Sequence, residues 1–290
     1  MDFGILVQAI INGIMVGGIY ALVGMSLNMI FGVMKIVNFC QGEMLMVSMY
    51  VTYLLYENLG LDPFIAIRIV AVVMFLFGAL IQTTLITRSI KEDGDQNVLF
   101  LTACLGIFLS NAALMLFTSD YKTVDSMFAN QIVTVGGMNI SVPRLVGFII
   151  LCIATALVFL MLKYTKVGKH IRATSQNAIG AQVTGIKTKV VYAYTYGIGA
   201  AIAGIAGACL MSYYYVFPSV GNTYGTRSFI VVTMGGLGST IGACLGGLGL
   251  GIMETVGSTL VGAAFRDTLV FLAFILILVV KENINRKKRG

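Results

Sequence analysis

Long runs without charge divide this sequence, and they restrict the possible folds more than any other feature. No charged residue occurs between Asp2 and Lys35. A membrane-spanning helix needs about 20 mainly apolar residues to cross about 30 Å of hydrocarbon. With 58% hydrophobic and only 11% charged residues, the chain has too few polar groups to cover a water-soluble core. The sequence predicts an all-α, polytopic transmembrane helical bundle.

Nine charge-poor segments are candidate membrane spans, which gives a bundle of about 8–9 spans. Segment 44–56 is short, and segment 229–238 is short enough to belong to a broken or re-entrant helix near 229–240. No linker divides the chain, so residues 1–290 are treated as a single transmembrane domain. The nine segments are 5–27, 44–56, 64–86, 98–118, 146–162, 190–213, 229–238, 241–261 and 268–280.

Basic residues indicate the orientation. Six of them and no acid lie from Lys163 to Lys189, and five more follow in the tail from Lys281. With three others, 14 of the 19 basic residues fall on one side of the alternating segments. By the positive-inside rule that side is cytoplasmic, including the C-terminus. An odd number of spans then leaves the N-terminus outside, with the longest outer loop near 119–143. The net charge of +7 indicates anionic lipids of the inner leaflet as the partner, and not nucleic acid.

The uncharged run 3–34 is too long for a simple span, because one helix of that length would measure about 48 Å. Two interpretations stay open: one tilted helix, or a helix that breaks at a glycine. Polar side chains would satisfy the backbone groups freed by a break. The candidate break points are Gly17, Gly18, Gly24 and Gly32, and the candidate partners are Asn12, Ser26 and Asn28.

Small residues predict close helix packing in two places. Ala200, Gly204 and Ala208 are four residues apart and would share one helix face, which allows backbones to touch. Residues 235–251 are the most glycine-dense part of the chain and begin with Gly235, Gly236 and Gly238. Because glycine weakens an isolated helix, this density indicates tight packing against other helices or a broken helix around 235–239.

Two acids lie within apolar surroundings, where a charge at the bilayer centre costs about 2.5–3.5 kcal/mol on insertion scales. Glu43 follows Asn38 and Gln41 closely, so the three either line a water-filled path or cap a helix, with Glu43 paired to Lys35. Glu254 comes three residues after the glycine-dense stretch. We favour a buried ion pair with an Arg or Lys of another helix over direct substrate contact for Glu254.

Catalytic and cofactor motifs are missing from the sequence. The five cysteines form no CxxC pair, and the single histidine, His170, stands among basic residues, so neither a metal nor a disulfide is expected. No HExxH, no GxSxG with a histidine partner, and no GxxxxGK[ST] phosphate loop occurs. The chain is therefore predicted to need no cofactor, to be no enzyme, and to bind no ATP by itself.

Several motifs together resemble one transporter family. In order they are GGIYALVG at 17–24, NFCQGE at 38–43, GKHIRATSQN at 168–177, VTGI at 183–186, and GGLGSTIGACLGG at 235–247 followed by Glu254. Their order and spacing resemble, nearly end to end, the permease subunits of bacterial branched-chain amino acid ABC importers, the LivH type. The resemblance makes residues 1–290 one transmembrane permease domain.

The resemblance also implies a cytoplasmic coupling loop at about 164–189. In the family, a short helix in this loop docks into a cleft on the ATPase subunit. Ile179 stands where the family motif usually has an acid, and Gly180 replaces its first alanine. The matching pattern, basic at its start and amphipathic in its middle, predicts a short helix lying flat on the inner surface. The residues assigned to the loop are Gly168, Arg172, Asn177, Ala181 and Gly185.

The function implied is import of branched-chain amino acids across the bacterial cytoplasmic membrane, driven by ATP hydrolysis on other subunits. The implied partners are a second homologous permease subunit, two ATP-binding subunits and an extracytoplasmic substrate-binding protein. Asn38, Gln41, Glu43 and Glu254 are the candidate substrate path, although Cys40 and Gln41 replace the family's usual alanine and histidine. A urea or short-amide permease of the same family, an ion-coupled secondary transporter using Glu43 and Glu254, and a channel stay open as alternatives.

Overall fold

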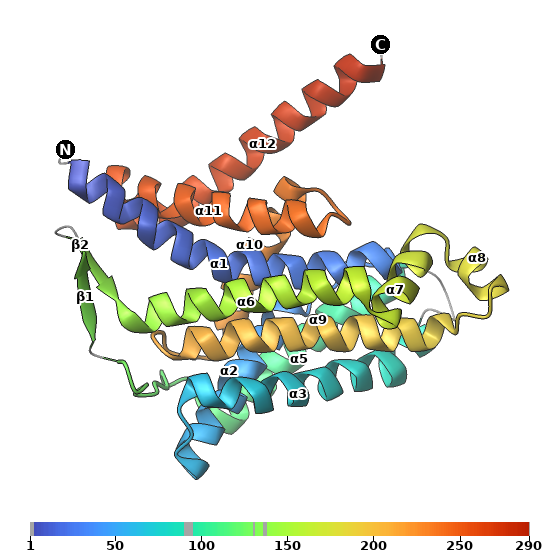
Figure 1. The fold of residues 1–290 in the computed structure, drawn as a ribbon, viewed down its shortest axis with the longest axis horizontal. Helices are drawn as coiled ribbons and strands as arrows, with labels where there is room; N and C mark the ends of the chain where they lie inside the picture. The colour runs from blue at the N-terminus through green and yellow to red at the C-terminus, as the bar shows by residue number, and fades with distance from the viewer. Residues whose placement is uncertain (1–2, 90–94, 130, 136–137, 290) are drawn as a thin grey trace.

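The computed structural model describes residues 3–89, 95–129, 131–135 and 138–289. Within these ranges the chain is mainly helical (Figure 1). The helices are α1 (Phe3–Met34), α2 (Gln41–Leu59), α3 (Pro63–Ile81) with its π-helical continuation η1 (Gln82–Ile86), α5 (Asp95–Phe117), α6 (Val142–Tyr164), α7 (Lys166–Gln176), α8 (Ala178–Val183), α9 (Thr188–Met211), α10 (Val220–Gly235), α11 (Thr240–Val261), the short 3-10 turn η2 (Ala263–Phe265) and α12 (Arg266–Arg289).

Six helices among the described residues are long and apolar enough to cross a membrane. The three other predicted spans are also helical, as α2, α10 and α12. Of these, α2 and α10 do not meet both requirements. For α10 the reason is length, because 16 residues reach only about 24 Å. The structure therefore supports a polytopic helical membrane protein and does not confirm a count of 8–9. The six spans are Gly4–Met34, Pro63–Ser89, Asn97–Phe117, Val142–Tyr164, Thr188–Met211 and Thr240–Val261.

The first helix is continuous over 32 residues, which confirms the single-helix interpretation of the uncharged run. The proposed break at Gly17, Gly18, Gly24 or Gly32 is wrong. These glycines serve instead as contact points for other helices. A Cβ on Gly17 would lie 2.8 Å from the Cα of Leu248, and one on Gly18 would lie 2.8 Å from the Phe148 ring.

Helices α1 and α11 pack antiparallel with their backbones in contact. Gly13 meets Ile252, and Gly17 meets Leu248 four residues further along α1. A side chain on Gly247 would overlap the backbone of Ala21. Such four-residue spacing of small residues gives a continuous seam where the dispersion contacts of two backbones hold the helices together.

Helix α9 is the centre of the bundle. In its most apolar 18-residue window 78% of the residues are buried, more than in any other candidate span of the described chain. The predicted small-residue face is confirmed, because Ala200, Gly204 and Ala208 are all buried. The Cβ of Ala200 packs on Gly78 of α3, and Gly204 packs on Met74 of the same helix.

The predicted helix break around 235–239 is present, because α10 ends at Gly235 and α11 begins at Thr240. Gly235 has the packing role assigned to it, since a side chain there would overlap Gly242 of α11. A Cβ on Gly32 of α1 would lie 3.5 Å from the Cα of Gly238, whereas nothing lies within 4 Å of a Cβ on Gly236. The φ angles of Gly236 and Gly238, 93° and 85°, lie in the left-handed region, so these two glycines form the turn between the helices.

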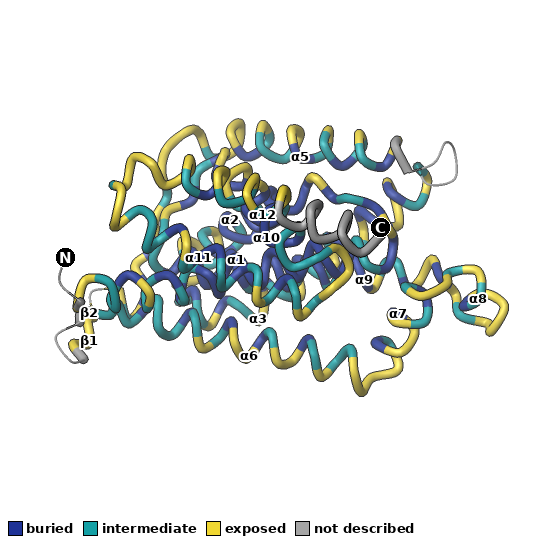
Figure 2. The backbone as a smooth tube through the Cα atoms, turned by 90° about the horizontal axis from the view of Figure 1, so that it is seen from above, coloured by how far each residue is buried: buried dark blue, intermediate teal, exposed yellow. Residues whose placement is uncertain are grey.

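Exposed apolar side chains cover the outside of the bundle. Figure 2 shows α5 and α6 at opposite edges with many exposed residues, around a buried centre containing α1, α2, α9 and α10. In each of the spans of α5 and α6, only 22% of the residues in the most apolar 18-residue window are buried. An apolar surface of this extent fits contact with lipid chains.

A small hairpin is a feature that the all-α prediction missed. β1 (Ile132–Val135) pairs antiparallel with β2 (Met138–Ser141), with Ile132 opposite Ser141. The preceding loop is tied to the bundle at Asp62, whose carboxylate accepts the amide N–H of Met127 at 2.6 Å. The hairpin and the α7–α8 region lie at opposite ends of the bundle (Figure 1), as predicted for the loops near 119–143 and 164–189.

Replacing Gly247 by valine tests the α1–α11 seam. The new side chain would meet the backbone of Ala21 and force the helices apart, so we expect the melting temperature in detergent to fall by several degrees, the effect of a loss of about 1–3 kcal/mol. Gly249→Val on the same helix is the control, because nothing lies within 4 Å of its Cβ position. Size-exclusion chromatography after heating measures both, and equal losses would contradict the seam.

Candidate functional site

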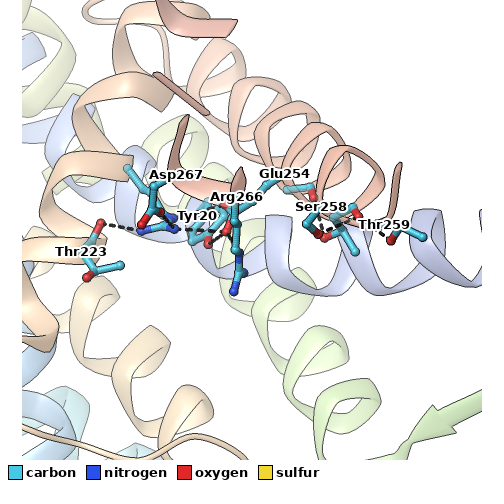
Figure 3. A network of polar contacts seen from close by, with 10 residues as sticks. Tyr20, Thr223, Glu254, Ser258, Thr259, Arg266 and Asp267 are labelled. Atoms are coloured by element: carbon cyan, nitrogen blue, oxygen red, sulfur yellow. Dashed lines mark hydrogen bonds and ion pairs between the residues drawn. The ribbon is translucent and has the colours of Figure 1, made fainter. Parts of the chain in front are cut away.

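A buried carboxylate of α11 joins four helices in one ionic network (Figure 3). Glu254 is fully buried, and Arg227 of α10 binds it through two nitrogens, each 3.2 Å from a carboxylate oxygen. Arg266, the first residue of α12, forms a second ion pair with it. Tyr20 of α1 donates its hydroxyl to the same carboxylate at 3.1 Å.

The network is balanced in charge because a second acid completes it. Asp267 accepts a hydrogen bond from Arg227 at 2.8 Å, so two arginines face two acids. Unpaired charges would be costly inside the bundle. The predicted ion pair between Glu254 and a basic residue of another helix is confirmed. Since its carboxylate is occupied by protein donors, Glu254 holds helices together, and a direct contact with substrate has no support in this geometry.

Four members of the network, Arg227, Arg266, Asp267 and Tyr20, were not predicted from the sequence. One signal was available: Arg227 is the sole basic residue between Lys189 and Arg266. A buried acid in that part of the chain needs a cation from a neighbouring helix.

A second polar group connects the start of α2 to α1 and α9. Asn38 donates to the side chain of Gln41 at 3.2 Å, and Gln41 donates to the hydroxyl of Ser26 at 2.5 Å. Ser26 in turn donates to the backbone carbonyl of Gly199 at 2.7 Å. The hydroxyl of Tyr196 is buried and has no hydrogen-bond partner within the described part of the chain. Asn38 and Gln41 lie together, as expected. Most of their side-chain polar atoms, however, are already hydrogen-bonded to protein groups.

Glu43 differs from these two residues, because no cation faces it. The residue is 6% exposed and lies in the first turn of α2. A Cβ on Gly106 of α5 would lie 3.4 Å from a carboxylate oxygen of Glu43. Of the two alternatives left open for Glu43, the ion pair with Lys35 is not found: the ion pairs between described residues have Arg227 and Arg266 as their cations. Lys35 follows the last residue of α1 with its side chain exposed.

Asn28 of α1 fixes the turn between α10 and α11. Its side-chain amide donates to the carbonyls of Gly236 and Ser239, at 3.0 and 2.6 Å, and accepts the N–H of Gly238 at 2.5 Å. Asn28 and Ser26 were predicted to satisfy backbone groups freed by a break in α1. They do satisfy backbone groups, but Asn28 satisfies those of the turn between α10 and α11, and Ser26 satisfies that of Gly199 in α9.

The loop 164–189 contains two helices where one was expected. α7 is capped by Thr165, which accepts the N–H of Gly168 at 3.0 Å, and α8 is capped by Asn177, which accepts the N–H of Gly180 at 2.9 Å. The helix is interrupted at Asn177, whose backbone is extended there. Gly168 is required because a side chain would overlap backbone carbonyls at the end of α6. Gly185 follows α8 with a φ of 85°.

The exposed side of α8 is apolar. Ile179 is 74% and Val183 is 83% exposed, and residues four apart share one face of a helix. Ala181 is buried, so it supports the loop from within and is not a contact surface. Arg172 folds back and donates to the backbone carbonyl of Lys163 at 3.3 Å. Both helices lie within the predicted loop 164–189, and the contact of this loop with an ATPase subunit stays a prediction.

An aromatic group lies on the loops at the end of the bundle where the hairpin is found. Tyr121 packs edge-on against Tyr215 with ring centroids 4.7 Å apart, and Phe217 lies 5.3 Å from Tyr121. Burial and the hydrogen bond with the hydroxyl of Tyr215 raise the pKa of the neighbouring Tyr214 to about 12, so the Tyr214 side chain is neutral at physiological pH. Among the described residues no three His, Cys, Asp or Glu side chains gather as metal ligands would.

Comparison with known proteins gives a consistent result along nearly the whole chain. The profile of the branched-chain amino acid transport system / permease component family matches residues 9–280. This chain belongs to that permease family. The chain is 28% identical to the high-affinity branched-chain amino acid transport system permease protein BraD of Pseudomonas aeruginosa, over 94% of this chain and 93% of BraD.

Other relatives agree with this assignment. The permease is 29% identical to the branched-chain amino acid permease protein LivH of Escherichia coli, over 94% of this chain and 92% of LivH. It is 23% identical to a probable LivH of Methanocaldococcus jannaschii, over 93% and 86%. No solved structure matches the permease. All of these relatives are named as permease proteins of branched-chain amino acid transport.

Glu254→Gln tests the ionic network of the permease. The change removes the negative charge that two arginines share, so the free energy of unfolding should fall by about 3–5 kcal/mol. Asp267→Asn is the matched control, because the Asp267 side chain is 74% exposed and exposed pairs contribute below about 1 kcal/mol. Unfolding by sodium dodecyl sulfate in mixed micelles measures both. Equal losses in the two variants would refute a network centred on Glu254.

Proposed function

We propose that the permease is the membrane-spanning subunit of an ATP-driven importer of branched-chain amino acids in the bacterial cytoplasmic membrane. The observation that carries this proposal is the family match from residue 9 to 280. The sequence has no phosphate loop of its own, so the energy has to come from partners. These partners are two ATP-binding subunits, a second homologous permease subunit and an extracytoplasmic substrate-binding protein.

The proposed orientation has α7 and α8 in the cytoplasm and the hairpin outside. The basic residues between Lys163 and Lys189 support it by the positive-inside rule. The C-terminus, with its five basic residues from Lys281 onward, is then cytoplasmic, and the outer aromatic group faces the binding protein. Aromatic side chains are enriched in protein interfaces, which fits this role.

The proposed contact with the ATPase is the apolar face of α8. Ile179 and Val183 project from a helix whose other side is anchored by buried Ala181. A short helix of this kind can enter a cleft with its two apolar side chains and transmit movement through the rest of the loop. The positive φ of Gly185 lets the chain turn back into α9 at once, so the helix is held close to the membrane.

Val183→Asp tests this contact. A carboxylate in the apolar cleft of the partner would be buried without a counterion, so we expect copurification of the ATPase subunits with the permease to fall at least about tenfold. Gln176→Asp, an exposed residue of α7, is the control and should retain them. Quantification of the subunits after affinity purification of the assembled complex gives the answer. Full retention with Val183→Asp would contradict docking through α8.

Within the proposed substrate path, Glu43 is the residue most suited to contact a zwitterionic amino acid. Its carboxylate is buried and has no protein cation opposite it among the described residues. The ammonium group of a passing amino acid can supply that cation. Asn38 and Gln41 then position the first turn of α2, because their polar atoms are bound to each other and to Ser26.

Glu43→Gln should reduce leucine uptake by the assembled transporter in proteoliposomes about tenfold or more, the effect of losing one charge-assisted contact in the transport cycle. Glu57→Gln on the same helix, where the side chain is exposed, should leave uptake unchanged. ATP hydrolysis by the partners is measured in parallel to show that the complex is intact. Normal leucine uptake by Glu43→Gln would remove Glu43 from the path.

The same proteoliposomes distinguish the alternative functions. ATP-dependent uptake of urea or a short amide, with no uptake of leucine, would replace the substrate class within the same family. Uptake driven by a proton or sodium gradient without the ATPase would indicate a secondary transporter. Ion conductance without either energy source would indicate a channel.

A further inference from the structure

Arg68 is a charge inside a membrane span to which the proposed function gives no role. It lies five residues after Pro63 within the candidate span Pro63–Ser89, about 7.5 Å along the helix. Its side chain is exposed on the outside of the bundle. Within the part of the chain that the structure describes, Arg68 has no hydrogen bond, ion pair or ring contact. A guanidinium in this position needs an anion from its surroundings.

The acid nearest to Arg68 in the sequence is already occupied. Asp62 caps α3 by accepting the N–H of Phe64 at 2.8 Å, and its other oxygen accepts the N–H of Met127 at 2.6 Å. The two oxygens of this carboxylate therefore hold the start of α3 and the outer loop. The anion that neutralises Arg68 has to come from outside the described chain.

Arg68 lines a groove of about 610 Å³ between α3, α6 and α9. The other lining residues are mainly apolar and include Ile67, Ile153, Leu157 and Ile202. On α6 the lining extends from Ile150 to Met161, about 16 Å along the helix axis. This length is close to half of the roughly 30 Å of bilayer hydrocarbon, the depth of one leaflet.

One cation above a long apolar groove in a membrane span fits a molecule with an anionic head and an acyl chain. We propose that this groove binds a phospholipid, with its phosphate on Arg68 and one acyl chain between α3, α6 and α9. Arginine forms paired hydrogen bonds with phosphate oxygens, and its long side chain can reach up to the headgroup level. With the orientation proposed above, the lipid belongs to the outer leaflet.

The occupant of the groove is identified by charge complementarity. A neighbouring transmembrane helix of another subunit would have to bring an acid into the hydrocarbon region to meet Arg68, whereas every phospholipid carries a phosphate at the correct depth. This inference does not depend on which solute the permease transports.

Native mass spectrometry of the delipidated permease tests the site. Dioleoyl phosphatidylglycerol is added back, and dioleoylglycerol, which has the same chains without phosphate, is the second probe. We expect the wild type to retain phosphatidylglycerol and not dioleoylglycerol. Arg68→Gln should weaken retention of phosphatidylglycerol about tenfold, by loss of one charge-assisted contact. Arg144→Gln, an outer arginine whose guanidinium lies over the Tyr213 ring, is the charge control and should bind normally.

A second variant tests the acyl-chain part of the groove. Ala201 lines it, so Ala201→Phe should fill it and weaken retention to a similar degree. Ala112→Phe on α5 adds the same bulk elsewhere and should not. Equal lipid retention by the wild type and Arg68→Gln, or equal retention of both probes by the wild type, would overturn the proposal.

The assembled transporter gives an independent outcome. A photo-crosslinking amino acid at Ile153, which is 54% exposed and lines the groove, should label phospholipid. Labelling of another protein subunit in place of lipid would show that the groove is a subunit interface and would refute the lipid site.

Discussion

Backbone contact between helices is the constraint on which the rest of this structure depends. Inside a bilayer, lipid chains are as apolar as leucine side chains, so burying an apolar face does not bring helices together as it does in water. Close packing has to supply the attraction. Gly17 against Leu248 in the α1–α11 pair, and Gly78 against Ala200 in the α3–α9 pair, let backbones approach to distances that side chains would prevent. The abundance of glycine in this chain has this physical reason.

Polar groups add specificity to this packing. Two arginines, Arg227 and Arg266, and two acids, Glu254 and Asp267, join α10, α11 and α12 by ion pairs. The hydrogen bond from Tyr20 to Glu254 adds α1. Asn28 fixes the turn between α10 and α11 from the side of α1. The carboxylate of Glu254 and the side-chain amide of Asn28 both find their partners within the protein, as buried polar groups in lipid generally do. Glu43 is the exception, since its buried carboxylate faces no protein cation among the described residues, and this difference is why the proposed function assigns it to substrate.

The sequence was sufficient to predict those features that depend on local patterns. Charge-free runs predicted membrane helices, the spacing of Ala200, Gly204 and Ala208 predicted a buried face, and the glycines near 235–239 predicted a helix break. Features that depend on contacts between distant segments were not predictable. Whether Gly17 and Gly18 break α1 or pack against neighbours depends on what lies opposite them, and the partner of Glu254 depends on how α10 crosses α11. The burial of Ala181 likewise follows from packing within the loop.

Within the helix pairs α1–α11 and α3–α9 the backbones lie in contact, whereas the direct contact between the two pairs is made by side chains. Where α1 meets α9, Ser26 gives one hydrogen bond to Gly199, and the end of the Ile30 side chain lies against the same glycine. A flexible side chain and a single hydroxyl group can exchange partners at little cost, whereas backbones in contact can separate only by losing their packing along the whole seam. Helix α2 has backbone contacts with both sides, because a side chain on Gly207 of α9 would meet the carbonyl of Leu45 and one on Gly42 would overlap the backbone of Gly221 in α10. The two helix pairs are therefore held together mainly through α2, and less through the direct contact of α1 with α9.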